Sequence, residues 1–178
     1  MRVKHILMTT KFFRLDSRSD SEIPAPNGAG VSLPNAFVNK LDAQLRRLAD
    51  LHLRVSLARL DREVISGRGD TPTQQIVDGL YDPSSIIGVG GDGSIVAAFL
   101  GPRDQEGSSG DQAIAARIER LFTGALAAAG IDEMRVRQNL TIVHGWTDEI
   151  HDVPGLALAL ERQRHGRKRA AEAKPRTA

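Results

Sequence analysis

The sequence predicts an α+β fold in which an antiparallel-rich sheet is covered by helices. Apolar residues recur with helical spacing in several segments, and short strand-like stretches lie between these segments. Two of the strand-like stretches follow each other with no helix between them. This order favours antiparallel pairing, because a parallel sheet requires strands and helices to alternate along the chain. A length of 178 residues suits one domain with terminal extensions.

The spacing of apolar residues defines the first predicted helix and strand. In residues 35–51, side chains such as Phe37 and Leu41 recur with a period close to 3.6 residues, as in an amphipathic helix. In residues 53–60, apolar side chains including Val55 alternate with their neighbours, which indicates a strand.

The rest of the chain continues this pattern. Its predicted elements are a helix at 71–80, a β-hairpin at 86–100, a helix at 112–129, a strand within 134–146 and a helix at 155–165. Gly130 and Gly166 are expected to end the two helices that precede them. In the strand, Leu140, Ile142 and His144 fall on one side and Val143 on the other.

Composition excludes several classes of function. The chain has no cysteine, so disulfides, thiol catalysis and cysteine-ligated metal sites are ruled out. No apolar run approaches the roughly 18 residues of a membrane span, and we expect a cytoplasmic protein. Residues 162–176 hold seven basic residues and one acid, while the remaining chain has more acids than bases. This uneven charge argues against a uniformly basic nucleic-acid-binding surface.

The same patterns divide the chain into three parts. Residues 1–31 form an N-terminal arm and linker, in which 3–15 mix apolar and basic residues and 16–30 are rich in Ser, Asp, Pro and Gly. The arm could be an added edge strand, a short helix or a partner-binding segment. Residues 32–169 form the predicted domain, and residues 170–178 are expected to be a flexible tail.

The hairpin turn is the most informative motif. Gly90-Gly91-Asp92-Gly93 lies between two apolar runs. Its backbone N–H groups could hold phosphate oxygens, with Asp92 binding a metal or a hydroxyl. The glycines could equally serve a tight turn that needs a positive φ.

The neighbouring motifs make the chain resemble a GGDEF domain, the diguanylate cyclase fold related to nucleotide cyclases. The resemblance covers residues 32–169 and rests on motifs that occur in the family's order. They are Leu33-Pro34-Asn35 with Phe37, the strand Val55–Asp61, Gly69-Asp70, Gly90-Gly91-Asp92, the helix Arg117–Ala127, the strand Leu140–Gly145 and the ending Gly166–Arg169.

The resemblance implies a site for Mg²⁺ and a guanine nucleotide, either GTP or cyclic di-GMP. Asp61 and Asp92 correspond to its metal ligands, although a shifted register would place Arg59 at the first of these positions. The residues that correspond to its nucleotide site are Asp70, Gly90, Gly91, Asp92 and Gly93. Gly93 stands where the family has a second acid, and the segment that reads guanine through an Asn is largely missing.

These departures predict a catalytically degenerate GGDEF-like signalling module with no catalytic residue. By resemblance it would be a bacterial-type regulatory domain in cyclic di-GMP signalling, able to form a homodimer and to act through a protein partner or by sensing a nucleotide. Two alternatives remain open: an enzyme, either a residual cyclase or a NAD- or lipid-kinase-like protein that uses the GGDGS turn, and a nucleic-acid binder that uses the basic C-terminal segment.

Overall fold

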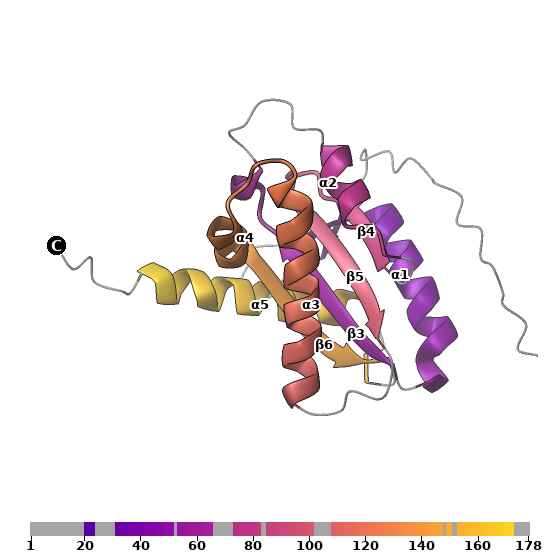
Figure 1. The fold of residues 1–178 in the computed structure, drawn as a ribbon. Helices are drawn as coiled ribbons and strands as arrows, with labels where there is room; N and C mark the ends of the chain where they lie inside the picture. Colours follow the sequence, from indigo (N-terminus) through magenta and orange to yellow (C-terminus); the bar gives the residue numbers. More distant parts are fainter. Residues whose placement is uncertain are drawn as a thin grey trace, which may run out of the picture.

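A four-stranded antiparallel sheet lies between two layers of helices, which confirms the predicted α+β class (Figure 1). The computed structural model describes residues 20–23, 31–51, 53–65, 73–82, 85–101, 108–147, 149–150 and 153–172. Two apolar clusters form the core, one on each face of the sheet. This three-layer arrangement buries the sheet on both sides.

The strand order of the sheet is β4-β5-β3-β6. These strands are β4 (Ser85–Val89), β5 (Ile95–Gly101), β3 (Arg54–Leu60) and β6 (Leu140–Trp146). Every residue of β3 is buried, as expected for an inner strand with helices over both of its faces. β4 and β5 form the predicted hairpin, with Val89 paired to Ile95 beside the glycine turn.

Each face of the sheet has its own set of helices. On one face, Phe37 of α1 (Asn35–Leu48) and Leu160 of α5 (Val153–Glu172) join the same apolar cluster. On the other face lie α2 (Thr73–Gly79), α3 (Ser108–Ala127) and α4 (Glu133–Asn139). The predicted sides of β6 are confirmed, because Leu140 and Val143 belong to different clusters. Two short 3₁₀ helices, Ala49–Leu51 and Arg62–Val64, flank β3.

The sequence prediction missed two features. A two-stranded sheet of β1 (Asp20–Ile23) and β2 (Val31–Pro34) lies partly within the predicted linker. The helix α4 precedes the last strand, and the side chain of its N-cap Asp132 accepts a hydrogen bond from the backbone N–H of Arg135.

The two glycines expected to end helices behave differently. Gly130 has a φ of 69° and follows the end of α3, as predicted. Gly166 does not end the last helix, because α5 continues through it to Glu172. Among the described residues only Gly93 and Gly130 are glycines with positive φ, so Gly166 keeps a helical backbone instead of the left-handed conformation of a C-cap.

No helix in the described part of the chain combines the length and the apolar character needed to span a membrane.

Candidate functional site

A buried arginine lies at the centre of the candidate site. Alternation along β3 places Arg59 on the same face as Val55 and Leu57, beneath α5. Its side chain is only 5% exposed. A buried guanidinium is costly unless its charge is paired, so this position requires carboxylate partners.

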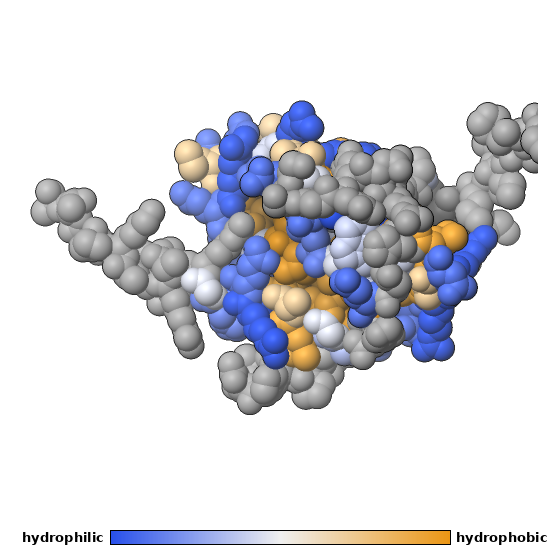
Figure 2. Space-filling model, turned by 90° about the horizontal axis from the view of Figure 1, so that it is seen from below, coloured by the Kyte–Doolittle hydropathy of each residue, from blue (hydrophilic) through white to orange (hydrophobic). Residues whose placement is uncertain are grey.

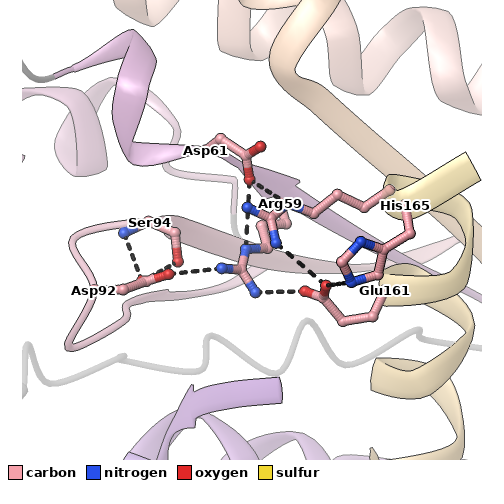
Figure 3. Close-up of polar contacts among 7 residues, drawn as sticks. Arg59, Asp61, Asp92, Ser94, Glu161 and His165 are labelled. Atoms are coloured by element: carbon pink, nitrogen blue, oxygen red, sulfur yellow. Dashed lines mark hydrogen bonds and ion pairs between the residues drawn. The ribbon is translucent and has the colours of Figure 1, made fainter. Parts of the chain in front are cut away.

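Three carboxylates from three different elements surround this guanidinium (Figure 3). Nη2 donates to Oδ2 of Asp92 at 2.6 Å, and Nη1 donates to Oε1 of Glu161 at 2.7 Å. Nε lies 3.8 Å from Oδ1 of Asp61. Asp92 belongs to the β4–β5 turn, Glu161 to α5, and Asp61 follows β3. Arg59 therefore joins the turn and the last helix to the middle of the sheet.

A second arginine completes this arginine–carboxylate cluster, which consists of Arg59, Asp61, Asp92, Glu161 and Arg164. Nε of Arg164 forms an ion pair with Oδ1 of Asp61 at 2.7 Å, and its Nη1 donates to Oε2 of Glu161 at 3.2 Å. Burial alone would lower the pKa of Arg164, but the bond and charge of Asp61 and the contact with Glu161 raise it. Arg164 therefore stays charged, and the cluster holds three negative and two positive groups.

The glycine turn is closed by its own hydrogen bonds. The N–H of Gly90 donates to the carbonyl of Ser94 at 2.8 Å, and the N–H of Gly93 donates to the carbonyl of Gly90 at 2.8 Å. Both the N–H and the hydroxyl of Ser94 donate to Oδ1 of Asp92, at 2.9 and 2.6 Å. Gly93 has a φ of 79°, which suits the left-handed residue of a hairpin bulge. Three N–H groups of the turn are thus already used within it.

These contacts keep Asp92 ionised. Burial alone would raise the pKa of its carboxyl group. The two hydrogen bonds from Ser94 and the charges of Arg59 and Arg164 outweigh this effect, so the pKa of Asp92 lies below its ordinary value. At neutral pH Asp92 is an anion whose charge is directed at Arg59.

The structure brings together only part of the residues that the sequence suggested. Asp61 and Asp92 both face Arg59, and Gly90, Gly91 and Gly93 form the turn beside them. Asp70 lies outside the described residues. The sequence interpretation did not include Glu161 or Arg164 in the site. The signal that could have revealed them is Arg59 itself, since a charged residue on a buried strand face implies buried partners.

This arrangement does not fit a divalent cation. The guanidinium of Arg59 lies between Asp61, Asp92 and Glu161, so a positive group already occupies the space where their oxygens converge. In the described part of the chain, no group of three His, Asp or Glu side chains is arranged to hold a metal. The turn also leads into a strand, β5, instead of the helix that a kinase-type phosphate loop requires.

The close contacts at Gly90 yield the first prediction. A Cβ at this position would lie 2.7 Å from Oδ1 of Asp92 and 2.9 Å from Oγ of Ser94. We therefore expect Gly90→Ala to lower the free energy of unfolding by about 1–3 kcal/mol, measured by urea denaturation. Gly124→Ala is the control, because a Cβ there meets nothing within 4 Å and should stabilise α3 by about 0.5–1 kcal/mol. Equal effects of the two substitutions would contradict this account of Gly90.

A histidine on the other face of the sheet gives a prediction about pH. Nδ1 of His144 lies 2.8 Å from Oγ of the buried Ser56. Burial lowers the pKa of His144, and the charge of Arg54 lowers it further, against the opposing charge of Asp111. The unfolded chain therefore binds a proton near the ordinary value of 6.5, whereas the folded protein binds it only at lower pH.

We therefore expect the free energy of unfolding to fall as the pH drops below 6.5. Urea unfolding at pH 7.5 and pH 5.5 measures this loss. His144→Asn removes the titrating ring and should reduce the difference in unfolding free energy between the two pH values. If the variant and the original protein lose the same amount, His144 is not the group responsible.

Comparisons with known proteins agree with this fold. No protein-family model and no curated protein matches the chain. Among solved structures, the chain is similar to the GGDEF domain of TpbB, also called YfiN, from Pseudomonas aeruginosa, determined as a fragment that comprises only this domain. The match has a TM-score of 0.50 and 21% identity, and covers 79% of this chain and 87% of the other. The predicted GGDEF-like fold is thereby confirmed.

Proposed function

We propose that this chain, which has the fold of a GGDEF domain, is a regulatory module that does not cyclise GTP and acts through contact with a protein partner. The observation that carries the proposal is the position of Arg59 among Asp61, Asp92 and Glu161. Cyclisation in this family would rely on divalent cations held by carboxylates to polarise the phosphates. Here the carboxylates bind a guanidinium instead.

The turn supports the same proposal. The N–H groups of Gly90, Gly93 and Ser94 bond within the hairpin, which removes three of the donors that a phosphate would need. Gly93 stands where the family carries its second acid, so no carboxylate extends from this position. This glycine has the positive φ that the turn demands. The hairpin is thus suited to hold Asp92 against Arg59.

A direct test is to incubate the chain with GTP and either Mg²⁺ or Mn²⁺, beside an active diguanylate cyclase as a positive control. We expect neither cyclic di-GMP nor pyrophosphate to form. A thermal-shift series with GTP, cyclic di-GMP, ATP and NAD, each with Mg²⁺, then separates a protein-binding module from a nucleotide sensor, because a ligand that binds only the folded state raises its stability.

Two results would overturn the proposal. The first is formation of cyclic di-GMP that Asp92→Ala abolishes, which would show a residual cyclase. The second is stabilisation by a guanine nucleotide that Asp92→Ala removes, which would show a nucleotide-sensing site.

A further inference from the structure

One edge of the sheet is formed by β6, the strand that pairs with β3. β6 is the outermost strand on one side of the order β4-β5-β3-β6. Among the residues that the structure describes, no strand pairs with its outer side. Such an edge offers backbone hydrogen-bonding groups to another strand, and proteins usually protect it.

The hydrogen-bond pattern shows which residues of β6 point outward. The N–H of Thr147 donates to the carbonyl of Leu53 at 2.8 Å, and the N–H of Asp61 donates to the carbonyl of Asn139 at 3.2 Å. Bonded and non-bonded pairs alternate in an antiparallel ladder, so the odd-numbered residues of β6 bond to β3. The backbone N–H and C=O groups of Ile142 and His144 therefore face away from the sheet.

The ends of this stretch are already occupied. The N–H of Leu140 donates to the carbonyl of Val136 in α4. The carbonyl of Trp146 accepts from the N–H of Ile150 at 2.8 Å. The outward groups of Ile142 and His144 lie between these two points, which leaves room for a short added strand.

A hollow of about 270 Å³ lies beside the same stretch. Its lining residues come from β6, from α3, from the C-terminal half of α4 and from the middle of α5: Asp111, Gln112, Ala115, Glu119, Arg137, Leu140, Ile142, His144 and Gln163. Figure 2 views the molecule from below and shows apolar surface between groups of hydrophilic residues. An apolar side chain of an added strand would enter this hollow and face Ile142.

The charges around the edge favour an acidic occupant. The two acids of the hollow already have partners, since Asp111 pairs with Arg54, and Glu119 lies 3.6 Å from Arg137. Gln163 lines the hollow, and beyond it α5 continues past the edge of the sheet (Figure 1). This part of α5 is strongly basic in sequence, with Arg167-Lys168-Arg169 following the exposed Arg162.

The charges also argue against an occupant from within the chain. The N-terminal arm carries Arg2, Lys4, Lys11 and Arg14 before its first acid, Asp16. Placed beside the basic end of α5, these residues would repel it.

We propose that the outer edge of β6 binds an extended, acidic peptide segment of a partner protein as an added strand. Backbone bonds to Ile142 and His144 provide affinity, the hollow accepts one apolar side chain, and acidic residues contact the basic end of α5. This proposal rests on the proposed function only in that the module acts through a protein partner. Formation of cyclic di-GMP would refute the proposed function and leave the strand-binding edge standing.

The test uses the full chain and a yeast-displayed library of eight-residue peptides with apolar residues at alternate positions and all amino acids at the others. We expect the selected peptides to be enriched in Asp and Glu at the varied positions. Fluorescence anisotropy then measures the binding of a selected peptide to two variants. Ile142→Pro removes the outward N–H without removing a bond to β3 and should weaken binding about tenfold.

Ile142→Ala is the matched control, because it shortens the same side chain but keeps the N–H, and it should bind more tightly than Ile142→Pro. Hydrogen exchange provides a readout that needs no variant: the amides of Ile142 and His144 should exchange more slowly when the peptide is bound. The proposal is overturned if no acidic peptides are enriched, if the proline and alanine variants bind equally, or if these two amides are not protected. Binding that salt abolishes and Ile142→Pro leaves unchanged would indicate general attraction of anions, including nucleic acid, to α5, and would also overturn it.

Discussion

Replacing Arg59 with leucine is expected to lower the free energy of unfolding by about 3–5 kcal/mol. The substitution leaves Asp61, Asp92 and Glu161 with one cation, Arg164, where the native protein has two. Asp61 and Glu161 are both buried, so water can replace the missing charge only in part. Removing one partner from a buried ion pair is costly because it leaves the other charge uncompensated.

Urea denaturation at neutral pH measures this effect, and a surface arginine provides the matched control. Arg46 pairs with Asp42 on α1 at 2.7 Å, but its side chain is 79% exposed. Arg46→Leu should therefore change the free energy of unfolding by no more than about 1 kcal/mol. If Arg59→Leu is as mild as Arg46→Leu, the pairing of Arg59 with these carboxylates does not stabilise the fold.

The sequence predicted the fold well where side-chain spacing reports burial directly. Phe37 and Leu41 of α1 are fully buried on the face that their helical period assigned. The alternation in residues 53–60 predicted the strand β3, although both of its faces are buried. The glycine turn also has the predicted hairpin form, because the positive φ of Gly93 is a local requirement. Such features depend on a few neighbouring residues and can be recognised without the tertiary structure.

Two features could not be recognised in this way, because their local sequence signal was misleading or weak. Gly166 looked like the end of a helix, yet α5 continues through it to Glu172. The helix α4 occupies a single short segment in which only Val136 is buried, so its apolar spacing carries no clear period.

The candidate site was only partly predictable from local patterns. Asp61 and Asp92 were singled out from motifs, but their common partner is Arg59, which the motif alignment left ambiguous between two registers. Glu161 lies 102 residues from Arg59 in sequence, and only the packing of α5 on β3 brings them within 2.7 Å. A local pattern identifies residues that can carry charge, whereas the tertiary fold determines which charge neutralises which.

The role assigned to Arg59 leads to a prediction about cations. If its guanidinium takes the place of a metal ion, Arg59→Asp should yield a domain whose stability depends on a divalent cation. The variant would gather carboxylates at positions 59, 61, 92 and 161, and oxygen-rich groups of this kind bind Mg²⁺, Ca²⁺ and Mn²⁺. Without a cation the four acids would repel one another, with only Arg164 to offset them.

Thermal and urea unfolding with EDTA or with millimolar Mn²⁺ test this prediction. A cation present at 100 times its dissociation constant should raise the stability of Arg59→Asp by about 2.7 kcal/mol. The native protein should not respond, because the guanidinium already occupies the convergence of the carboxylates, and Arg59→Leu should respond less than Arg59→Asp because it contributes no ligand. The same shift in all three proteins would mean that Mn²⁺ binds elsewhere, and no shift in Arg59→Asp would mean that these carboxylates cannot rearrange around a metal ion. Either outcome would refute the view that Arg59 substitutes for a bound cation.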